Sequence, residues 1–271
     1  MSRIAGCFEK LQQQGRKALI PYIVAGDPSQ ELTVPLMHKL VEQGANIIEI
    51  GVPFSDPMAE GPVIQLAHER ALESHTGLRG ILAMVTTFRE TNNDTPVVLM
   101  GYANPVEHMG YQAFASAAHE AGVDGVLTVD IPPEEATPLN TELKKFAIDH
   151  IFLIAPTTDE QRIKQIAALA TGFVYFVSLK GVTGAGHLDT AMVERKLTQI
   201  KAHTSLPIGV GFGIKDADTA AAIAKLAEGV VVGSALVDAV HQQVQKNTDE
   251  QTLLNTATQI IADMRLAIDA V

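Results

Sequence analysis

Short apolar segments alternate with amphipathic segments along the whole chain. Most of the apolar segments are continuous runs, which are typical of parallel strands covered on both faces. Helix-period patterns lie between them, and several end in glycine, a common helix terminator. The predicted strands are 18–26, 46–52, 96–102, 124–130, 150–156, 172–178, 206–212 and 229–235, and clear helical patterns occupy 32–44, 111–122, 194–204 and 218–229.

This alternation predicts a closed (β/α)8 barrel, the TIM-barrel fold of the α/β class, in a single domain over residues 1–271. An open doubly wound sheet is the alternative, but it usually has fewer strands at this length and a glycine fingerprint after the first one. Here the first strand is followed by AGDPSQ, which is not such a fingerprint. Residues 2–16 predict an extra N-terminal helix that closes the bottom of the barrel, and two helical segments, 62–76 and 78–91, follow the second strand.

The composition narrows the class of protein. With 46% hydrophobic and 19% charged residues, the chain can form a substantial core. The net charge of −11 argues against nucleic acid and against an anionic membrane as the main partner. The lone Cys7 excludes an internal disulfide and fits a reducing compartment. No apolar run approaches the roughly 20 residues of a membrane span, so we expect a cytoplasmic protein. The nine histidines show neither HxH nor HExxH spacing, so no metal site is predicted.

One carboxylate, Glu49, interrupts the apolar run of the second predicted strand. Its side chain shares a strand face with Ile47 and Gly51, whereas Ile48 and Ile50 point the other way. If the first face is the barrel interior, the carboxylate looks into the pocket mouth. Desolvation there raises its pKa towards neutrality and suits it to acid–base chemistry. A buried ion pair is the alternative, although no Lys or Arg stands at the neighbouring strand ends.

Glycine-rich turns follow three predicted strands, VTGAG at 182–186, VGFGI at 210–214 and VVGSA at 231–235. Glycine lets backbone N–H groups approach an anion, and a helix N-terminus adds a favourable dipole. The loops after strands seven and eight are also the recurrent phosphate site of TIM barrels. We therefore predict a phosphate site, with 234–240 as its short helix and Ser234 as a hydroxyl donor. Tight turns without a ligand are the alternative.

The segment 53–62, PFSDPMAEGP, follows the strand that carries Glu49. Its three prolines and two acids make it too polar and too broken for core, and they predict a mobile loop over the site. Asp56 and Glu60 are either catalytic or simply solvated, and the pattern alone leaves both alternatives open.

Long motifs resemble the tryptophan synthase alpha chain family over the full length of the chain. They are IEIGVPFSDPMAEGP, VVLMGYANP, GVLTVDIPPEE, FLIAPTT, FVYFVSLKGVTGA, GVGFGI and VVVGSALV. The resemblance implies a retro-aldol cleavage of indole-3-glycerol phosphate to indole and glyceraldehyde 3-phosphate, in tryptophan biosynthesis, with no metal or organic cofactor.

The resemblance places the two catalytic carboxylates on Glu49 and Glu60. The family pattern normally has aspartate at the second position, so Glu60 keeps the charge but is one methylene longer. Tyr102, at the end of the third strand, is a further candidate for substrate binding. The other implied residues are Tyr22, Ile64, Met100, Leu127, Phe212 and Val232 around the indole, Tyr175 near the glycerol chain, Thr183 beside the second carboxylate, and Gly184, Gly213, Gly233 and Ser234 at the phosphate.

The resemblance also implies a partner, the beta chain, which takes indole onward to tryptophan in an alpha2–beta2 heterotetramer. The candidate contacts are Pro53, Asp56, Asn104, Pro105 and Pro132. Two alternatives to the carboxylate mechanism remain. One is a Schiff-base aldolase that uses Lys180. The other is a catalytically weak barrel subunit that activates a partner, which Glu60 in place of aspartate would favour.

Overall fold

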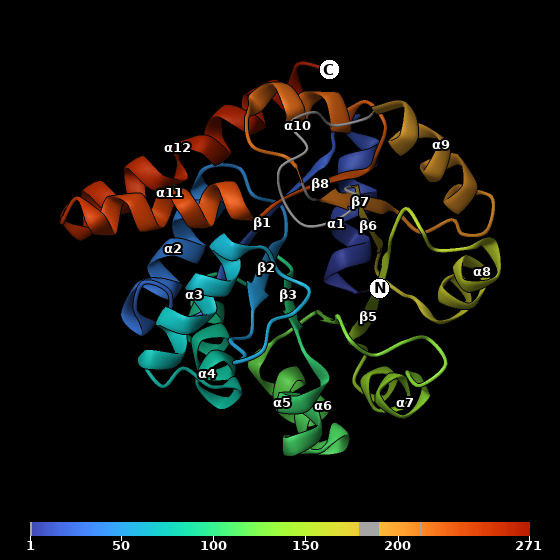
Figure 1. Ribbon diagram of the computed structural model, residues 1–271, viewed down its shortest axis with the longest axis horizontal. Coiled ribbons are helices and arrows are strands. Elements are labelled where there is room, and N and C mark those ends of the chain that lie inside the picture. Colours follow the sequence, from blue (N-terminus) through green and yellow to red (C-terminus); the bar gives the residue numbers. More distant parts are fainter. Residues whose placement is uncertain (1, 179–189, 212) are drawn as a thin grey trace.

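The computed structural model describes residues 2–178, 190–211 and 213–271. These residues form a closed barrel of parallel strands surrounded by helices (Figure 1). The strands are β1 (Ala18–Val24), β2 (Ile48–Gly51), β3 (Val97–Gly101), β4 (Gly125–Thr128), β5 (Asp149–Ile154), β6 (Val174–Val177), β7 (Ile208–Gly211) and β8 (Gly229–Val232). The helices are α1 (Arg3–Gln13), α2 (Gln30–Glu42), α3 (Pro62–Glu73), α4 (Leu78–Arg89), α5 (Ala103–Met109), α6 (Tyr111–Ala121), α7 (Thr137–Lys145), α8 (Glu160–Leu169), α9 (Thr190–Lys201), α10 (Ala217–Ala224), α11 (Ser234–Gln245) and α12 (Glu250–Asp269).

The closed strand order β1 to β8 confirms the predicted (β/α)8 barrel and excludes the open sheet. Each predicted strand overlaps an observed one and contains it, except that β5 begins one residue before the predicted 150–156, and α3 and α4 follow β2 as expected. The predicted short helix at 234–240 is the first part of a longer helix, α11, which α12 then follows.

Several helices begin where the sequence offers a capping side chain. Ser29 and Asp159 accept hydrogen bonds from the backbone at the starts of α2 and α8, and Asp216 forms a reciprocal capping box with Thr219 at α10. In the described part of the chain, no helix combines the length and the apolar character that crossing a membrane requires.

Alternation along each strand divides the core into two layers. An inner cluster fills the barrel, with Ile20 and Tyr22 from β1 and Met100 from β3. An outer cluster lies between the strands and the helices, with Ile48 and Ile50 from β2. Because side chains point to opposite faces with a period of two, this division puts Glu49 on the inner face, as predicted.

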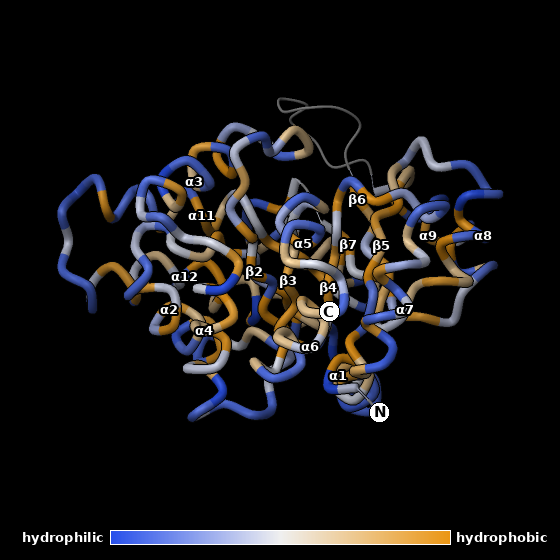
Figure 2. The backbone as a smooth tube through the Cα atoms, turned by 90° about the horizontal axis from the view of Figure 1, so that it is seen from below, coloured by the Kyte–Doolittle hydropathy of each residue, from blue (hydrophilic) through white to orange (hydrophobic). Residues whose placement is uncertain are grey.

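The first helix closes the lower end of the barrel, as the sequence predicts. Ile4, Phe8 and Leu11 project from α1 into the inner cluster. The ring of Phe8 lies 5.8 Å from that of Phe173, which immediately precedes β6. Figure 2 shows α1 at the lower edge of the molecule, beneath the strands.

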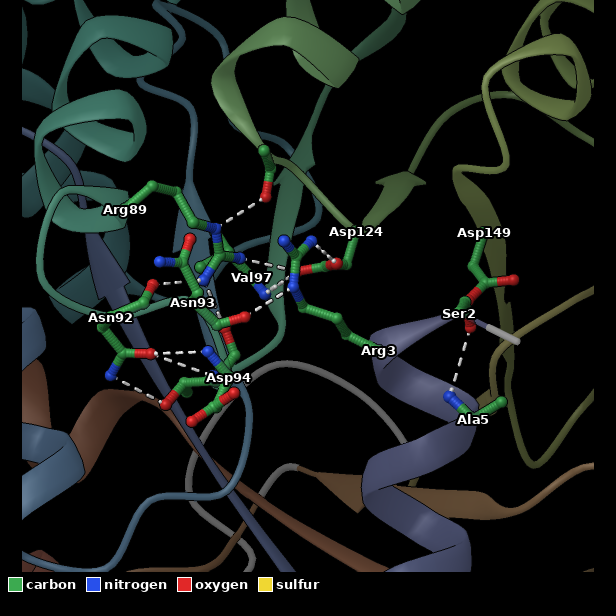
Figure 3. A network of polar contacts seen from close by, with 12 residues as sticks. Ser2, Arg3, Ala5, Arg89, Asn92, Asn93, Asp94, Val97, Asp124 and Asp149 are labelled. Atoms are coloured by element: carbon green, nitrogen blue, oxygen red, sulfur yellow. Dashed lines mark hydrogen bonds and ion pairs between the residues drawn. The ribbon is translucent and has the colours of Figure 1, made fainter.

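A polar network fixes α1 to the barrel (Figure 3). Asp124, just before β4, pairs with Arg3 of α1 at 2.8 Å and with Arg89 of α4 at 2.7 Å. Its Oδ2 also accepts the Val97 N–H of β3 at 2.8 Å. Because Asp124 and Arg89 are both buried, this carboxylate joins two helices to two strands at the end of the barrel opposite the strand C-termini.

Candidate active site

A cavity of about 460 Å³ opens where the strands of the barrel end. Its wall combines carboxylates, tyrosines, apolar side chains and glycines. The lining residues are Tyr22, Glu49, Ala59, Glu60, Gly61, Ile64, Met100, Val129, Leu153, Tyr175, Val177, Gly213, Ile214, Val231, Gly233 and Ser234.

Most of the predicted site residues that the structure describes line this cavity. They are Tyr22, Glu49, Glu60, Ile64, Met100, Tyr175, Gly213, Gly233 and Ser234. Thr183, Gly184, Phe212 and the alternative nucleophile Lys180 lie outside the described residues.

Tyr102 and Leu127 lie beside the cavity rather than in its wall. Leu127 belongs to the inner cluster and is fully buried. Tyr102 is buried behind the loop after β2, where its ring stacks on Phe54 with centroids 4.9 Å apart. Its Oη accepts a hydrogen bond of 3.1 Å from the Ala59 N–H. Tyr102 therefore supports the loop next to Glu60.

The structure corrects the prediction for Val232. This side chain lies in the outer cluster, towards the helices, whereas its neighbour Val231 lines the cavity. The run GVVVG has no polar position to mark which face is inside, and a shift of one residue moves every side chain to the opposite face.

Glu49 is a buried carboxyl group that forms no hydrogen bond with the part of the chain that the structure describes. It is 1% exposed, and neither Oε atom has a hydrogen-bond partner among the described residues. Burial, and secondly the charge of Glu60, raise the pKa of Glu49 to about 8. An ion pair, the alternative that the sequence left open, is therefore not formed with any described Lys or Arg. A carboxyl group in this setting holds its proton near neutral pH and can donate it.

Glu60 ends the loop after β2 and precedes α3, whose N-cap is Gly61. It is 5% exposed, so it is not the solvated loop acid of the alternative interpretation. Burial raises the pKa of Glu60 to about 7. Near neutral pH the cavity therefore contains one acid that is mostly protonated and another that ionises more readily, a pattern that suits an acid and an anionic acceptor.

Tyr22 and Tyr175 each extend over a glycine of the neighbouring strand. A Cβ at Gly51 of β2 would collide with the Tyr22 hydroxyl, and a Cβ at Gly211 of β7 would collide with the Tyr175 hydroxyl. Both rings are buried. Burial first, and then the charges of the two carboxylates, raise the pKa of both phenols well above the usual value. Both hydroxyls therefore remain protonated and able to donate.

Gly213, Gly233 and Ser234 line the cavity where α11 begins. Gly213 has a φ of +76°, and Gly233 immediately precedes α11. No side chain caps this helix, and the first N–H groups of a helix lack intrahelical partners. Such an N-terminus favours an anion. Within the described residues, no group of three or more His, Cys, Asp or Glu side chains could hold a metal ion.

The candidate partner contacts lie on segments that follow β2, β3 and β4, around the same end of the barrel. Asp56 and Asn104 are exposed, Pro105 and Pro132 are half-buried, and Pro53 is buried. The loop of Asp56 also carries Met58, which is 79% exposed.

Sequence reasoning missed part of the cavity wall. Two of the missed residues, Val129 and Val177, lie two positions after the predicted site residues Leu127 and Tyr175. Because side chains two positions apart point to the same face of a strand, this spacing could have identified them. The complete set of missed lining residues is Ala59, Gly61, Val129, Leu153, Val177, Ile214 and Val231.

Solved structures resemble this fold over its full extent. The tryptophan synthase subunit alpha of Legionella pneumophila strain Paris superimposes with a TM-score of 0.92 and 44% identity, covering 100% of both chains. A chain of the tryptophan synthase from Mycobacterium tuberculosis in its aminoacrylate-bound form gives a TM-score of 0.85 at 34% identity, covering 97% of this chain and 100% of that one.

Sequence comparisons agree with the structural ones. The tryptophan synthase alpha chain of Thioalkalivibrio sulfidiphilus is 59% identical over 269 residues, which is 99% of this chain and 100% of the relative. That of Marinobacter nauticus is 57% identical over 270 residues, 100% of this chain and 99% of the relative. The family model described as tryptophan synthase alpha chain matches residues 8–265. The chain therefore belongs to the tryptophan synthase alpha chain family.

Proposed function

We propose that Glu49 and Glu60 carry out the reaction of this family, the cleavage of indole-3-glycerol phosphate to indole and glyceraldehyde 3-phosphate. The observation that carries this assignment is the buried carboxyl of Glu49, which has no hydrogen-bond partner among the described residues and shares a cavity with the N-terminus of α11. An acid on one side and an anion site on the other match a substrate that has an aromatic ring at one end and a phosphate at the other.

Glu49 acts as the general acid. Its proton goes to C3 of the indole, which makes the ring electron-poor. The bond between C3 and C1′ then breaks, and its electrons return to the ring. The C1′ hydroxyl loses its proton and becomes the aldehyde of glyceraldehyde 3-phosphate. The ionised Glu49 is available to take up that proton, which returns it to its starting state.

Glu60 accepts a hydrogen bond from the indole N–H and stabilises the positive charge that develops on the ring. This role requires the ionised form. Since burial raises the pKa of Glu60 to about 7 and that of Glu49 to about 8, kcat/KM should rise with pH near 7 and fall near 8. Such a bell-shaped profile belongs to the coupled pair of carboxyls.

The remaining cavity residues bind the substrate. Tyr22, Ile64 and Met100 provide an apolar wall for the indole, and the Tyr175 hydroxyl faces the glycerol chain. The backbone at Gly213 and Gly233, with Ser234, holds the phosphate at the N-terminus of α11. The support for these roles is the position of each residue in the cavity wall together with the family resemblance.

The partner of the family is the beta chain, and we place its contacts on the segments after β2, β3 and β4 in an alpha2–beta2 assembly. The exposed Met58 offers an apolar contact there. A cytoplasmic location suits a biosynthetic enzyme whose one cysteine, Cys7, is a free thiol.

A turnover assay tests the proposal. The full chain is incubated with indole-3-glycerol phosphate, and indole is quantified for the wild type, Glu49→Gln and the exposed control Glu73→Gln. We expect Glu49→Gln to lose at least about 100-fold in kcat, because a general acid contributes on that order, and Glu73→Gln to remain active.

Unchanged activity in Glu49→Gln would contradict the assignment. Borohydride reduction in the presence of substrate separates the alternatives. A trapped covalent adduct would favour the Lys180 mechanism, and an inactive wild type that raises the activity of the beta chain would favour the non-catalytic subunit.

A further inference from the structure

A chain of hydrogen bonds joins the cavity wall to the loop that carries Glu60. The Oη of Tyr22 lies 3.3 Å from Nε2 of His68, and the backbone N–H of Phe54 donates to Nδ1 of the same ring at 3.1 Å. His68 is 1% exposed on α3, one turn after the cavity residue Ile64. Tyr22 lines the cavity, and Phe54 begins the segment that leads to Glu60.

The contact with Phe54 determines the protonation of His68. A neutral imidazole has one donor nitrogen and one acceptor nitrogen. Since Nδ1 accepts from a backbone N–H, the proton lies on Nε2, which donates to Tyr22 Oη. Burial agrees with this assignment, because it lowers the pKa of His68 to about 4. The Tyr22 hydroxyl thus receives one hydrogen bond and keeps its own proton for a group in the cavity.

The far end of the same loop has its own support. The Ala59 N–H donates to Tyr102 Oη at 3.1 Å, directly before Glu60. The ring of Tyr102 stacks on the ring of Phe54. The segment 54–60 is therefore anchored at its start by His68 and at its end by Tyr102. Of these two anchors, His68 also contacts Tyr22 of β1 in the cavity wall, whereas Tyr102 hydrogen-bonds Ala59 of the loop itself.

We propose that His68 is a positioning residue that links Tyr22 to the loop of Glu60, so that substrate packed on the Tyr22 ring steadies Glu60 for its hydrogen bond to the indole. The link depends on two specific atoms of the imidazole, the acceptor Nδ1 and the donor Nε2–H. The expected change in kcat rests on the proposed role of Glu60. The hydrogen-bonded link from Tyr22 through His68 to Phe54 does not depend on that role.

The titration of Glu60 reports on this link. Its pKa is raised by burial, so a loosened loop that admits water should lower the pKa towards the ordinary value near 4.5. Within the described segments, the titratable groups that face Glu60 are Glu49 on β2, Tyr22 on β1, Tyr102 after β3 and Tyr175 on β6. A substitution at His68 removes none of these side chains, although it changes the hydrogen bonding of Tyr22.

Two substitutions separate the two atoms of the ring. In His68→Gln the side-chain amide takes the position of Nε2 and retains the contact with Tyr22, but the acceptor for Phe54 is lost. In His68→Asn the amide oxygen takes the position of Nδ1 and retains the acceptor, but the donor to Tyr22 is lost. His119→Gln, exposed on α6, is the matched control.

The Glu60 carboxyl is titrated by ¹³C NMR in the full chain, with its signal assigned from Glu60→Gln. We expect His68→Gln to lower the pKa of Glu60 by roughly one unit or more, and His68→Asn and His119→Gln to leave it close to the wild-type value. An unchanged pKa in a folded His68→Gln would overturn the proposal. If that variant does not fold, Tyr22→Phe, which keeps the ring, takes its place in the kinetic arm below.

Kinetics of indole formation provide the second arm. Because a misplacement of about 1 Å can cost about 100-fold in rate, we expect kcat to fall by roughly tenfold or more in His68→Gln, with a smaller change in KM. His68→Asn and Tyr22→Phe should each lower kcat, and their double variant should be no worse than the poorer single one. Additive losses would overturn the link through Tyr22. A wild type without turnover would contradict the proposed function alone, since the NMR titration still tests the link.

Discussion

Glu49 shows how a single residue can oppose the stability of the fold that contains it. Both carboxyl oxygens are buried without a partner among the described residues. The folded protein retains a proton on this group up to a pH of about 8, whereas an ordinary glutamate loses it near 4.5. Ionisation in the folded state is therefore unfavourable, and the same property makes the group a proton donor near neutral pH.

This property predicts a pH dependence of stability. Between about pH 4.5 and 8 the folded state binds more protons at Glu49 than the unfolded state, so the free energy of unfolding falls as the pH rises through this window. Glu60, whose pKa is raised to about 7, contributes with the same sign. We expect Glu49→Gln to be more stable than the wild type at pH 8 by on the order of a few kcal/mol, with the difference shrinking towards pH 5.

Urea denaturation of both proteins at pH 5 and pH 8 measures the difference. Glu73→Gln, exposed on α3, should follow the wild type at both values. Parallel stability curves for Glu49→Gln and the wild type would contradict the prediction.

The Tyr22 side chain packs directly against Gly51 of the neighbouring strand. A methyl group at Gly51 would collide with the Tyr22 hydroxyl, and overpacking of this kind typically costs about 1–3 kcal/mol. We therefore expect Gly51→Ala to lower both the midpoint of thermal unfolding and the catalytic rate. Tyr22→Phe removes the closest colliding atom but leaves the ring carbon Cζ, 2.6 Å from the added Cβ, so it should recover only part of the stability lost in Gly51→Ala. Calorimetry of the two single variants and the double variant tests this, and strictly additive losses would refute it.

The residues also show what a sequence can and cannot predict. Glu49 was identifiable because burying a lone carboxylate in an apolar strand is energetically unfavourable, which indicates a functional role. Val232 was assigned to the wrong face because a continuous apolar run carries no alternation to mark the inside. The contact between Tyr22 and His68 could not be predicted, since it depends on how α3 packs against β1.

At the scale of elements, α1 is the clearest case in which pattern and structure agree. Its apolar positions predicted a helix that closes the barrel, and Ile4, Phe8 and Leu11 do so. By contrast, α5 was not predicted, because within its seven residues only Val106 is buried and no apolar stripe marks the helix. The position of each strand could be predicted from its own apolar run. The closure of the barrel could be predicted only from the number and order of all the strands and helices together.

The network beneath the barrel predicts a large effect on stability. Asp124 holds Arg3, Arg89 and the Val97 N–H, and Arg89 is buried. Asp124→Ala would leave the guanidinium of Arg89 buried without its carboxylate, which typically costs about 3–5 kcal/mol. Chemical denaturation measures the loss. Asp94→Ala, exposed in the loop before β3, is the control and should change stability by less than about 0.5 kcal/mol. Equal behaviour of the two variants would contradict the role given to the network.

At the scale of the molecule, the two ends of the barrel differ in chemistry. The lower end is closed by α1 and fixed by ion pairs, whereas the upper end carries the cavity, the loop of Glu60 and the exposed Met58. This asymmetry follows from the fold, because the loops after parallel strands all meet at one end. The family motifs lie in the same loops, which is why the site could largely be predicted once the barrel was recognised.

The exposed apolar residue at the upper end predicts a contact with the beta chain. We expect Met58→Ala to weaken the complex by about 1–2 kcal/mol, or roughly 5- to 30-fold in Kd, as for a buried interface side chain. Titration calorimetry with the purified beta chain measures this. The control is Leu266→Ala, which removes a residue that is 73% exposed. The adjacent Arg265 donates hydrogen bonds to the Lys17 carbonyl oxygen and to the Asn46 side chain at the lower end of the barrel, so this control lies away from Met58. Equal affinities for both variants would place the interface elsewhere.

Side chains of the inner cluster fill the barrel, and the helix beneath the strands covers its lower end. Ile4, Phe8 and Leu11 pack into its base, and the described cavity residues lie at the opposite rim, so we expect the reactant to arrive and both products to depart there. If the described opening is the route for both, departing indole and incoming substrate share one passage. A protein bound at that rim would control the order in which substrate enters and products leave, and it would be the first to contact the released indole.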